Sequence, residues 1–490
     1  MKKLILICAA VIIVLFATVP ARADAWEIRI FIDGIHVEFA HPPMFVDEKM
    51  FVPARDLFVA LGFGISWDGE LKQAEFLNET YRIALTIGSD ILAINNTYVR
   101  VDAPAFLHGT IAMLPLRSVL ENIGYRVEWD DAARSASISV PYILTPPEPY
   151  TVAETVAGRG SHGGYYSLLS EQLNLPAGIA GLPGGGLLIA DTGSNAIKII
   201  DEYGTVSHFA GEIQIAARDN FPMGFYRDQE LLLAGFNRPT SIGVNEQGTI
   251  FIVDSQNHAI RVITNGAVRT LTGGNGAGFA DGNPNAAMFN SPSALSICPN
   301  GYLFVADTGN HAIRRVDRYG YVTTVAGVPG YFGFSDGIAS YALFDSPMGI
   351  VAAYGKVYVA DTGNHLIRVI ENDTVSTVAG SRVLADEEDE LWGQVPIGGY
   401  IDAIGTAAMF NFPVGLALWH ENIIVADMGN HSVRMIVWNR QVVTIGGTGY
   451  PGFMHGIEPI FHLPRGVYIR GNFLYVADTG NNMVRRINLE

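Results

Sequence analysis

Ala306-Asp307-Thr308-Gly309-Asn310-His311 is the best-defined copy of a motif that recurs six times after residue 150. In every copy a basic residue follows the aspartate by seven positions, and a proline precedes it by 14 or 15 positions. The six aspartates are Asp191, Asp254, Asp307, Asp361, Asp427 and Asp478. A period of about fifty residues with several short strands per unit is typical of the blades of a β-propeller.

The third unit shows how one blade is built. Its apolar runs predict four strands, from the innermost to the outermost, at residues 294–297, 303–306, 312–316 and 322–326. Asp307-Thr308-Gly309-Asn310 is predicted to turn the chain between the second and third strands, with the aspartate accepting backbone N–H groups and Gly309 supplying a positive φ. Gln256 replaces this glycine in the second unit, so we expect that turn to differ.

The number of strands predicts a closed ring of six blades. The first five units each contain an outer strand, whereas the sequence ends directly after the third strand of the sixth unit. A matching strand precedes the first unit, at residues 154–158. We therefore expect residues 152–158 to pair with residues 484–488, which would remove two exposed sheet edges.

A different repeat occupies residues 27–140. Val52-Pro53-Ala54-Arg55 matches Leu114-Pro115-Leu116-Arg117, and Trp67-Asp68 matches Trp129-Asp130, all at an offset of 62. Each proline can open a helix at its first turn, and each Trp-Asp pair ends a strand. The whole chain is thus predicted to be an all-β six-bladed propeller at 151–490, preceded by a small α+β domain of two similar halves at 24–140.

The N-terminus has the features of a secretory signal peptide at residues 1–23. Lys2 and Lys3 precede an apolar run, and Ala21-Arg22-Ala23 is a small-x-small cleavage site. An uncleaved membrane anchor is the alternative, but the run is short and breaks at Pro20. Residues 141–150 are proline-rich and predict a semi-rigid linker. We expect a secreted or cell-envelope protein with no transmembrane segment after cleavage.

The charge of the chain excludes some partners. Lys+Arg 31 against Asp+Glu 48 gives a net charge of -17, which disfavours nucleic acid and anionic lipid surfaces. Removal of the signal peptide leaves Cys298 as the single cysteine, so no internal disulfide is possible.

Both repeats resemble known families. The Ala-Asp-Thr-Gly-Asn-His-x-Ile-Arg pattern resembles the NHL repeat, as does the Phe-x-Asp-Gly-x(4)-Ala-x-Phe-x-x-Pro run at 279–292 and 334–347. The first repeat resembles the copper amine oxidase N-terminal-like domain, a module common on exported bacterial proteins. In that family the module is a stalk and not the copper or quinone site. The NHL resemblance implies a fold more than a function, because the family includes ligand-binding domains, interaction platforms and a few lyases or hydrolases.

Two long loops, 212–238 and 381–412, are the best candidates for a specific partner site. The first contains Phe225, Tyr226 and Arg227, and the second contains an acidic run with Asp386 and Glu387, followed by Trp392. The alternative is that both loops are solvated decoration.

Two sets of repeated residues have metal-ligating chemistry. One carboxylate lies eleven positions before the proline in four units, as Asp228, Asp281, Asp336 and Asp402. A ring of such carboxylates could hold calcium, but a feature repeated in each blade is more often a turn cap. The turn histidines His258, His311, His365 and His431 could likewise form a metal ring, and we favour a structural role. No cofactor is predicted, although a divalent ion (calcium or zinc) stays possible.

We expect a propeller that binds a protein, peptide or glycan outside the cytoplasm, and we favour binding over catalysis. The alternative is a metal-dependent propeller lyase or hydrolase with a site at the central channel. Such an enzyme would need irregular ligands, for which the candidates outside the repeat are His162, His208, His420, His455 and His462.

Overall fold

The computed structural model describes residues 28–32, 35–69, 71–77, 82–94, 97–123, 125–139, 153–158, 172–216, 222–384, 396–437, 439–456 and 458–489. The chain divides into two compact units, Met1–Tyr142 and Ile143–Glu490. The predicted signal peptide and linker lie outside the described residues. None of the helices in the described ranges is long and apolar enough to span a membrane.

The first unit contains three sheets and two short helices among its described residues. One sheet has the order β12 (Arg126–Asp130), β13 (Ser135–Ser139), β1 (Arg29–Ile32), β2 (Ile35–Val37). A second has the order β10 (Phe106–His108), β11 (Ile111–Pro115), β4 (Lys49–Pro53), β3 (Met44–Val46). The third is a meander of β5 (Gly64–Asp68), β6 (Gln73–Leu77), β7 (Arg82–Thr86), β8 (Ile91–Ile94) and β9 (Thr97–Arg100).

The repeated prolines of this unit lie at equivalent places. Helix α1 (Ala54–Ala60) begins directly after Pro53, and α2 (Leu116–Asn122) begins directly after Pro115. Proline is tolerated there because the first N–H groups of a helix have no intrahelical acceptor. The strands that lead into the two helices pair antiparallel, with Leu114 opposite Val52.

The second unit contains six sheets of four or five strands within its described residues. Sheet 1 has β15 (Pro176–Gly181), β16 (Leu187–Asp191), β17 (Ala196–Ile200) and β18 (Val206–Ala210). Sheet 2 has β22 (Pro239–Val244), β23 (Ile250–Asp254), β24 (Ala259–Thr264), β25 (Ala267–Gly273) and β21 (Gln229–Glu230). Sheet 3 has β26 (Ala294–Ile297), β27 (Leu303–Asp307), β28 (Ala312–Val316) and β29 (Val322–Ala326), as predicted to within one residue.

Sheets 4 to 6 repeat this order. Sheet 4 has β31 (Gly349–Ala353), β32 (Lys356–Asp361), β33 (Leu366–Glu371), β34 (Thr374–Ala379) and β30 (Gly337–Ile338). Sheet 5 has β37 (Pro413–Trp419), β38 (Asn422–Asp427), β39 (Ser432–Ile436) and β40 (Val442–Gly446). Sheet 6 has β41 (Pro464–Arg470), β42 (Phe473–Asp478), β43 (Met483–Asn488) and β14 (Glu154–Gly158).

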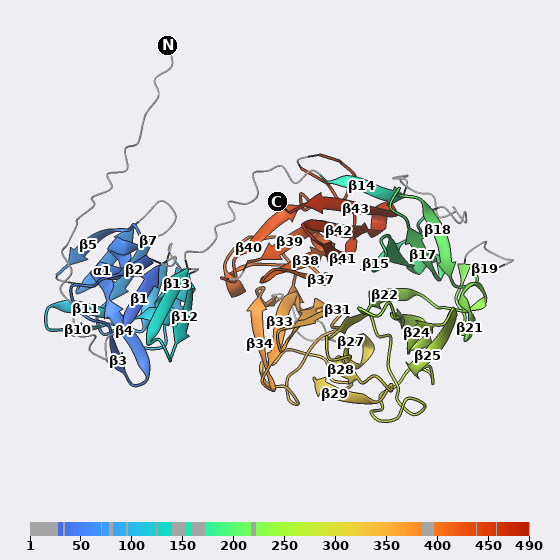
Figure 1. The fold of residues 1–490 in the computed structure, drawn as a ribbon, viewed down its shortest axis with the longest axis horizontal. Helices are drawn as coiled ribbons and strands as arrows, with labels where there is room; N and C mark the ends of the chain where they lie inside the picture. Colours follow the sequence, from blue (N-terminus) through green and yellow to red (C-terminus); the bar gives the residue numbers. More distant parts are fainter. Residues whose placement is uncertain are drawn as a thin grey trace, which may run out of the picture. The chain divides into compact units, whose positions relative to one another are not determined.

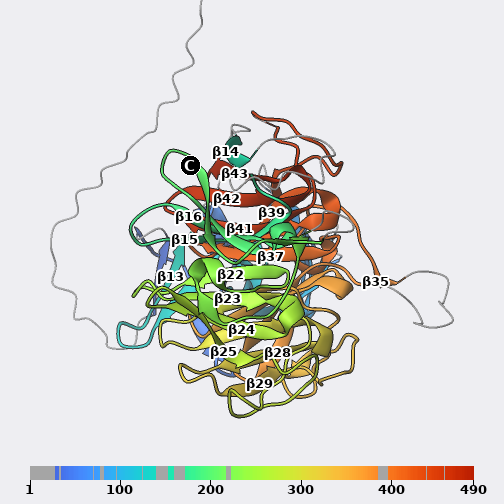
Figure 2. The same cartoon turned by 90° about the vertical axis from the view of Figure 1, so that its right-hand side faces the viewer.

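The innermost strands of the six sheets form a ring (Figure 1). They contact one another in the order β15, β22, β26, β31, β37, β41 and back to β15. Each sheet extends outward from this ring, as β22 to β25 of sheet 2 show in Figure 2. Radial sheets around a common centre are the architecture of a β-propeller.

The two ends of the second unit meet in sheet 6, where β14 lies beside β43 (Figure 1). The strands are antiparallel, with Glu154 opposite Arg486 and Gly158 opposite Met483. This confirms the predicted pairing for the described residues 154–158. Because β43 would otherwise be an open edge strand, the pairing protects it from other chains.

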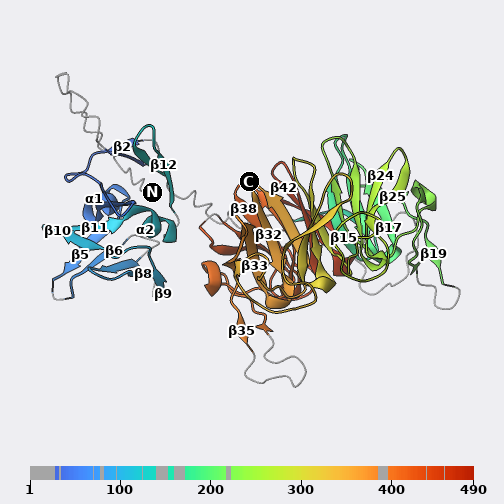
Figure 3. The same ribbon diagram turned by 90° about the horizontal axis from the view of Figure 1, so that it is seen from below.

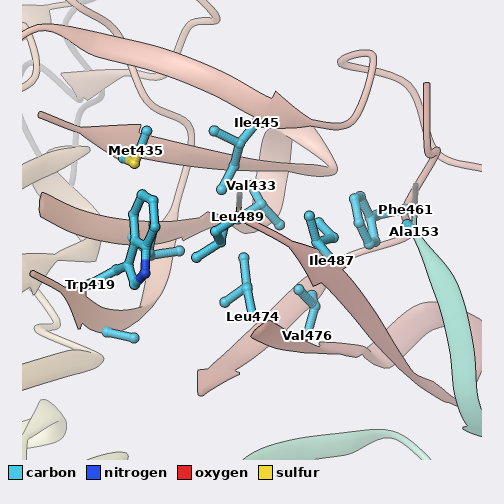
Figure 4. Close-up of a cluster of buried hydrophobic side chains, with 12 residues drawn as sticks. Ala153, Trp419, Val433, Met435, Ile445, Phe461, Leu474, Val476, Ile487 and Leu489 are labelled. Atoms are coloured by element: carbon cyan, nitrogen blue, oxygen red, sulfur yellow. The ribbon is translucent and has the colours of Figure 1, made fainter. Parts of the chain in front are cut away.

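Apolar side chains fill the space between neighbouring sheets. Between sheets 5 and 6, Trp419, Met435 and Ile445 lie on one side, and Leu474, Val476 and Ile487 on the other (Figure 4). Phe461, from the loop between the sheets, completes this cluster. A fully buried phenylalanine recurs at the equivalent position of four other loops, as Phe236, Phe289, Phe344 and Phe410, and Leu173 takes this position before sheet 1.

The motif turns correct two predictions. In all six turns the residue with positive φ is the one two positions after the glycine position, as at His311 (φ 54), and not the glycine itself. Gly309 leaves space for its neighbour, since a Cβ there would lie 2.6 Å from Cγ of Asn290. The turn at Gln256 does not differ, because Ser255–Asn257 form the same 3-10 turn and His258 has φ 52.

Candidate functional site

Each motif aspartate is fully buried and lies at the centre of a polar cluster. In sheet 4, Oδ1 of Asp361 accepts the N–H of Asp345 at 2.7 Å. Oδ2 accepts from Nδ2 of Asn364 at 2.9 Å and from Nη1 of Arg368 at 2.7 Å. Burial raises the pKa of Asp254, Asp307, Asp361 and Asp427 to about 6. Burial likewise raises the pKa of Asp191 and Asp478.

A second carboxylate completes the cluster. Arg368 donates from Nη2 and Nε to Oδ1 of Asp336 at 2.7 and 3.0 Å. Its guanidinium lies between the rings of Phe334 and Phe344, with ring centroids 4.9 and 5.0 Å away. A guanidinium donates ionic hydrogen bonds in its plane and contacts aromatic rings with its faces.

The four candidate calcium ligands all have this role. Asp228, Asp281, Asp336 and Asp402 lie in separate clusters and bind Arg261, Arg314, Arg368 and Arg434 respectively. The structure therefore does not bring these four carboxylates together. Within the described residues, no three His, Cys, Asp or Glu side chains form a group that could hold a metal ion.

Sheets 1 and 6 depart from the pattern. In sheet 1 a lysine replaces the arginine, with Nζ of Lys198 2.9 Å from Oδ2 of Asp191. In sheet 6 His455 takes the place of the outer aspartate, and its Nε2 lies 3.4 Å from Oγ1 of Thr155. Arg485 lies between Phe453 and Phe461, but its ion pair with Asp478 is longer, at 3.5 Å.

The turn histidines join neighbouring sheets. Nδ1 of His311 accepts the N–H of Ser346, the residue before the proline of the next sheet, at 3.0 Å. His258, His365 and His431 accept in the same way from Ser291, Phe412 and Leu463. Asn195 and Asn482 do so with Oδ1. The sequence favoured a structural role for the histidines, but this link between sheets was not predicted. The signal for it was that asparagine replaces histidine in the first and sixth copies of the motif.

A second link between sheets is made by the motif threonines. The hydroxyl of Thr362 donates to the carbonyl oxygen of Pro413 at 2.7 Å. Thr192, Thr308 and Thr479 donate in the same way to the first proline of the next sheet. Sheet 5 has Met428 at this position, which cannot donate to Pro464.

Met428→Thr is therefore expected to stabilise the propeller by about 0.5–1.5 kcal/mol, the net value of one hydrogen bond. The gain would appear as a higher midpoint in urea unfolding. Met428→Val is the matched control, since valine has the branched shape of threonine without its hydroxyl. An equal gain from both variants would contradict the hydrogen-bond explanation.

A cavity of about 460 Å³ lies at the centre of the ring, lined by the innermost strands of all six sheets. Its first layer consists of the residues that directly follow the prolines: Ala177, Thr240, Ser293, Met348, Val414 and Arg465. The next layer is made of small residues, because a Cβ on Gly415 or Gly466 would clash with the carbonyl oxygen of the neighbouring strand. Arg465 is the single charged residue in the described lining.

The two long loops form hairpins that project on the same side of the propeller (Figure 3). They are β19 (Gln214–Ile215) with β20 (Pro222–Met223), and β35 (Val383–Leu384) with β36 (Pro396–Ile397). The motif turns lie on this side too. Each turn follows the second strand of a sheet, and each long loop follows the fourth strand, which runs in the same direction as the second.

The structure describes three of the six candidate partner residues in these loops. The ring of Tyr226 lies 4.9 Å from the guanidinium of Arg261, so it belongs to the repeated cluster. Arg227 pairs with Glu212, and its guanidinium lies 5.1 Å from the ring of Phe225. Asp386, Glu387 and Trp392 lie outside the described residues.

Comparison with known proteins agrees with this architecture. Residues 31–138 match the copper amine oxidase N-terminal domain family, and residues 464–484 match the LVIVD repeat family. NHL repeat-containing protein 2 of Homo sapiens is 31% identical over 211 residues, covering 38% of this chain and 28% of that protein. Protein SUPPRESSOR OF QUENCHING 1, chloroplastic, of Arabidopsis thaliana is 29% identical over 293 residues, covering 57% of this chain and 27% of that protein.

The chain thus spans just over a quarter of the length of either relative. Among solved structures, an auxiliary nutrient binding protein from Bacteroides thetaiotaomicron aligns with a TM-score of 0.49 and 13% identity, covering 83% of this chain and 93% of that chain.

Proposed function

We propose that this chain, an NHL-type propeller with a copper amine oxidase N-terminal domain, is an exported binding protein. Its six sheets are the six blades of the closed ring, and its N-terminal domain is a stalk of two similar halves. The propeller engages a protein, peptide or glycan on the side that bears the motif turns and the 212–238 and 381–412 loops. The observation that carries this proposal is the 460 Å³ central cavity, whose volume is typical of a ligand site.

The links between sheets support a binding role, because they fix the shape of the cavity before a ligand arrives. A proline lies at the start of each innermost strand or two residues before it, and a turn of the preceding sheet holds the backbone groups beside that proline. A rigid site loses less entropy on binding than a mobile one. The two long loops depart from the repeat and can supply specificity without changing this scaffold.

The proposal is tested on the mature protein, residues 24–490, with arrays of peptides and glycans followed by calorimetry. Replacement of residues 385–395 by two glycines is expected to weaken binding of the ligand that the screen identifies and to leave the melting temperature unchanged. The matched control is Tyr203→Ser, an exposed position in the turn between β17 and β18. Failure of every ligand class to bind, or equal binding by all variants, would contradict the proposal.

Export is tested separately by N-terminal sequencing of the protein recovered from medium and envelope fractions. We expect the mature chain to begin at Asp24. A cytoplasmic protein that retains residues 1–23 would overturn the assignment.

Chelation is expected to leave the melting temperature of the mature protein unchanged. The candidate carboxylates are already occupied, since Asp336 accepts from Arg368 and from the N–H and hydroxyl of Thr377. Calorimetry with and without EDTA, together with plasma mass spectrometry, measures this. About one divalent ion per chain, lost together with several degrees of stability, would instead favour the lyase or hydrolase alternative.

A further inference from the structure

Arg465 is unlike the other arginines that face the interior of the propeller. It lies in the first layer of the central cavity, at the end nearest the motif turns. Its Nε is buried and has no hydrogen-bond partner among the described residues, as is also the case for Nε of Arg261 and Arg485. The other five sheets have an uncharged residue at this position, namely Ala177, Thr240, Ser293, Met348 and Val414. Arginine is thus a departure from the repeat at the axis of the ring.

The buried basic residues of the repeat show what Arg465 lacks. Lys198, Arg261, Arg314, Arg368, Arg434 and Arg485 each pair with a fully buried aspartate. A charge that is removed from water without such a partner is strongly destabilising. No carboxylate of the described residues forms an ion pair with Arg465. Within the part of the chain that the structure describes, the positive charge of Arg465 thus has no carboxylate partner, although the net charge of the chain is -17.

A second cation lies near the first. Arg238 directly precedes Pro239 at the start of β22, and its N–H donates to Oδ1 of Asn195 at 2.7 Å. Burial, and secondarily the charge of Arg238, lower the pKa of Arg465. The exposed Arg238 and the more buried Arg465 create a positive potential at one end of the cavity.

The rest of the lining limits the ligand. The hydroxyl of Thr240 donates to the carbonyl oxygen of Ser293 at 2.8 Å, and that of Ser293 donates to Met348 at 2.9 Å. These hydroxyls therefore hold the strands together. Below them the innermost strands line the cavity with polar and apolar atoms in similar measure. Ile179 and Ile242 of these strands are buried in the cores between the sheets. The cavity therefore offers one strong recognition group and a wall of mixed polarity.

We propose that Arg465, assisted by Arg238, binds the carboxylate of a ligand whose remaining part enters the central cavity. The planar guanidinium can donate two parallel hydrogen bonds to a carboxylate, which suits Arg465 better than a point charge would. The volume of 460 Å³ fits a small organic acid or the last residues of a peptide. This inference rests on the proposed binding function and names the chemistry that the cavity selects.

The test uses calorimetry and thermal shift on the mature protein with three probes at millimolar concentration. They are acetyl-Leu-Leu with a free carboxylate, its C-terminal amide, and hexanoate. We expect the free carboxylates to bind and raise the melting temperature, and the amide not to bind. Binding of the peptide acid alone would identify a peptide C-terminus as the source, and equal binding of hexanoate a small acid.

The decisive variant is Arg465→Met, which retains an unbranched apolar stem and removes the charged guanidinium. It is expected to weaken carboxylate binding about tenfold or more, the value of a hydrogen bond to a charged group. It is also expected to raise the melting temperature of the free protein, because an unpaired charge is removed. Arg238→Met should weaken binding less, and Arg269→Met, an exposed arginine on β25, should change nothing.

Three results would overturn this inference: no carboxylate binds, the amide binds equally, or Arg465→Met binds as the original protein does. A lower melting temperature for Arg465→Met would also overturn it, by showing that the chain itself supplies the partner. If no carboxylate binds but the ligand from the screen still binds and is weakened in the 385–395 variant, this inference fails and the proposed function stands.

Discussion

Asp361→Asn is expected to destabilise the propeller by about 3–5 kcal/mol, as found when one partner of a buried ion pair is removed. The substitution changes almost no volume, so the loss is electrostatic. Asp361 accepts from the N–H of Asp345, from Asn364 and from Arg368, and an asparagine amide would place N–H donors against at least one of them. Arg368, whose side chain is fully buried, would lose its buried counter-charge.

Asp336→Asn is the matched control, because Asp336 binds the same arginine from the other side. Its side chain is 39% exposed, so solvent screens the charge and we expect a clearly smaller loss. Urea unfolding followed by circular dichroism compares the two variants at pH 7.5. Equal losses would show that burial does not decide the energetics of the cluster, and a negligible loss for Asp361→Asn would refute its central role.

The repeat alone predicted most of the fold. The strands of sheet 3 follow from the alternation around Asp307. The pairing of β14 with β43 follows from a strand at 154–158 that precedes the first repeat. These features are local in sequence or countable, so one sequence is sufficient to find them. Helices α1 and α2 could also be predicted from the sequence, since each begins directly after a proline.

The polar clusters were not predictable in the same way. Asp361, Arg368 and Asp336 were each visible as repeated residues, but Asp336 lies 32 residues from the arginine that it binds. Only the folded chain shows that each of these aspartates is the counter-ion of an arginine in its own cluster. Arg465 was also missed, because a single arginine after a proline has no pattern until the ring places it at the axis.

The glycine error has a physical reason as well. The turn needs one residue with positive φ that also accepts a hydrogen bond from the next sheet, and glycine has no side chain for this purpose. Histidine and asparagine meet both needs, as His311 and Asn482 show. The same requirement makes the links between sheets sensitive to acid.

Acid is expected to destabilise this protein more than a variant in which His258, His311, His365 and His431 are all asparagine. Burial lowers the native-state pKa of each histidine below its usual 6.5, and the neighbouring charge of His462 lowers that of His431 further. Asp345 acts in the opposite direction on His311 and His365. The unfolded chain therefore takes up protons first as the pH falls below about 6.5.

The sign follows from this difference. The stability contributed by neutral histidines is complete above the unfolded pKa and is lost as the pH falls through the lower native values. All four histidines shift in the same direction, so their contributions to the pH dependence add. The buried aspartates act oppositely, since their raised pKa of about 6 makes their contribution decrease as the pH rises. They are present in both proteins and cancel in the comparison.

The measurement is the difference in melting temperature between the two proteins from pH 7.5 to pH 5.5. Asparagine is the appropriate replacement because Asn195 and Asn482 already make the same hydrogen bond at the same backbone conformation. We expect similar melting temperatures at pH 7.5 and a widening advantage for the asparagine variant below pH 6.5. Parallel curves over this range would mean that the Nδ1 acceptors do not control stability in acid. The pairing of β14 with β43, or the aspartate clusters, would then have to account for any loss of stability in acid.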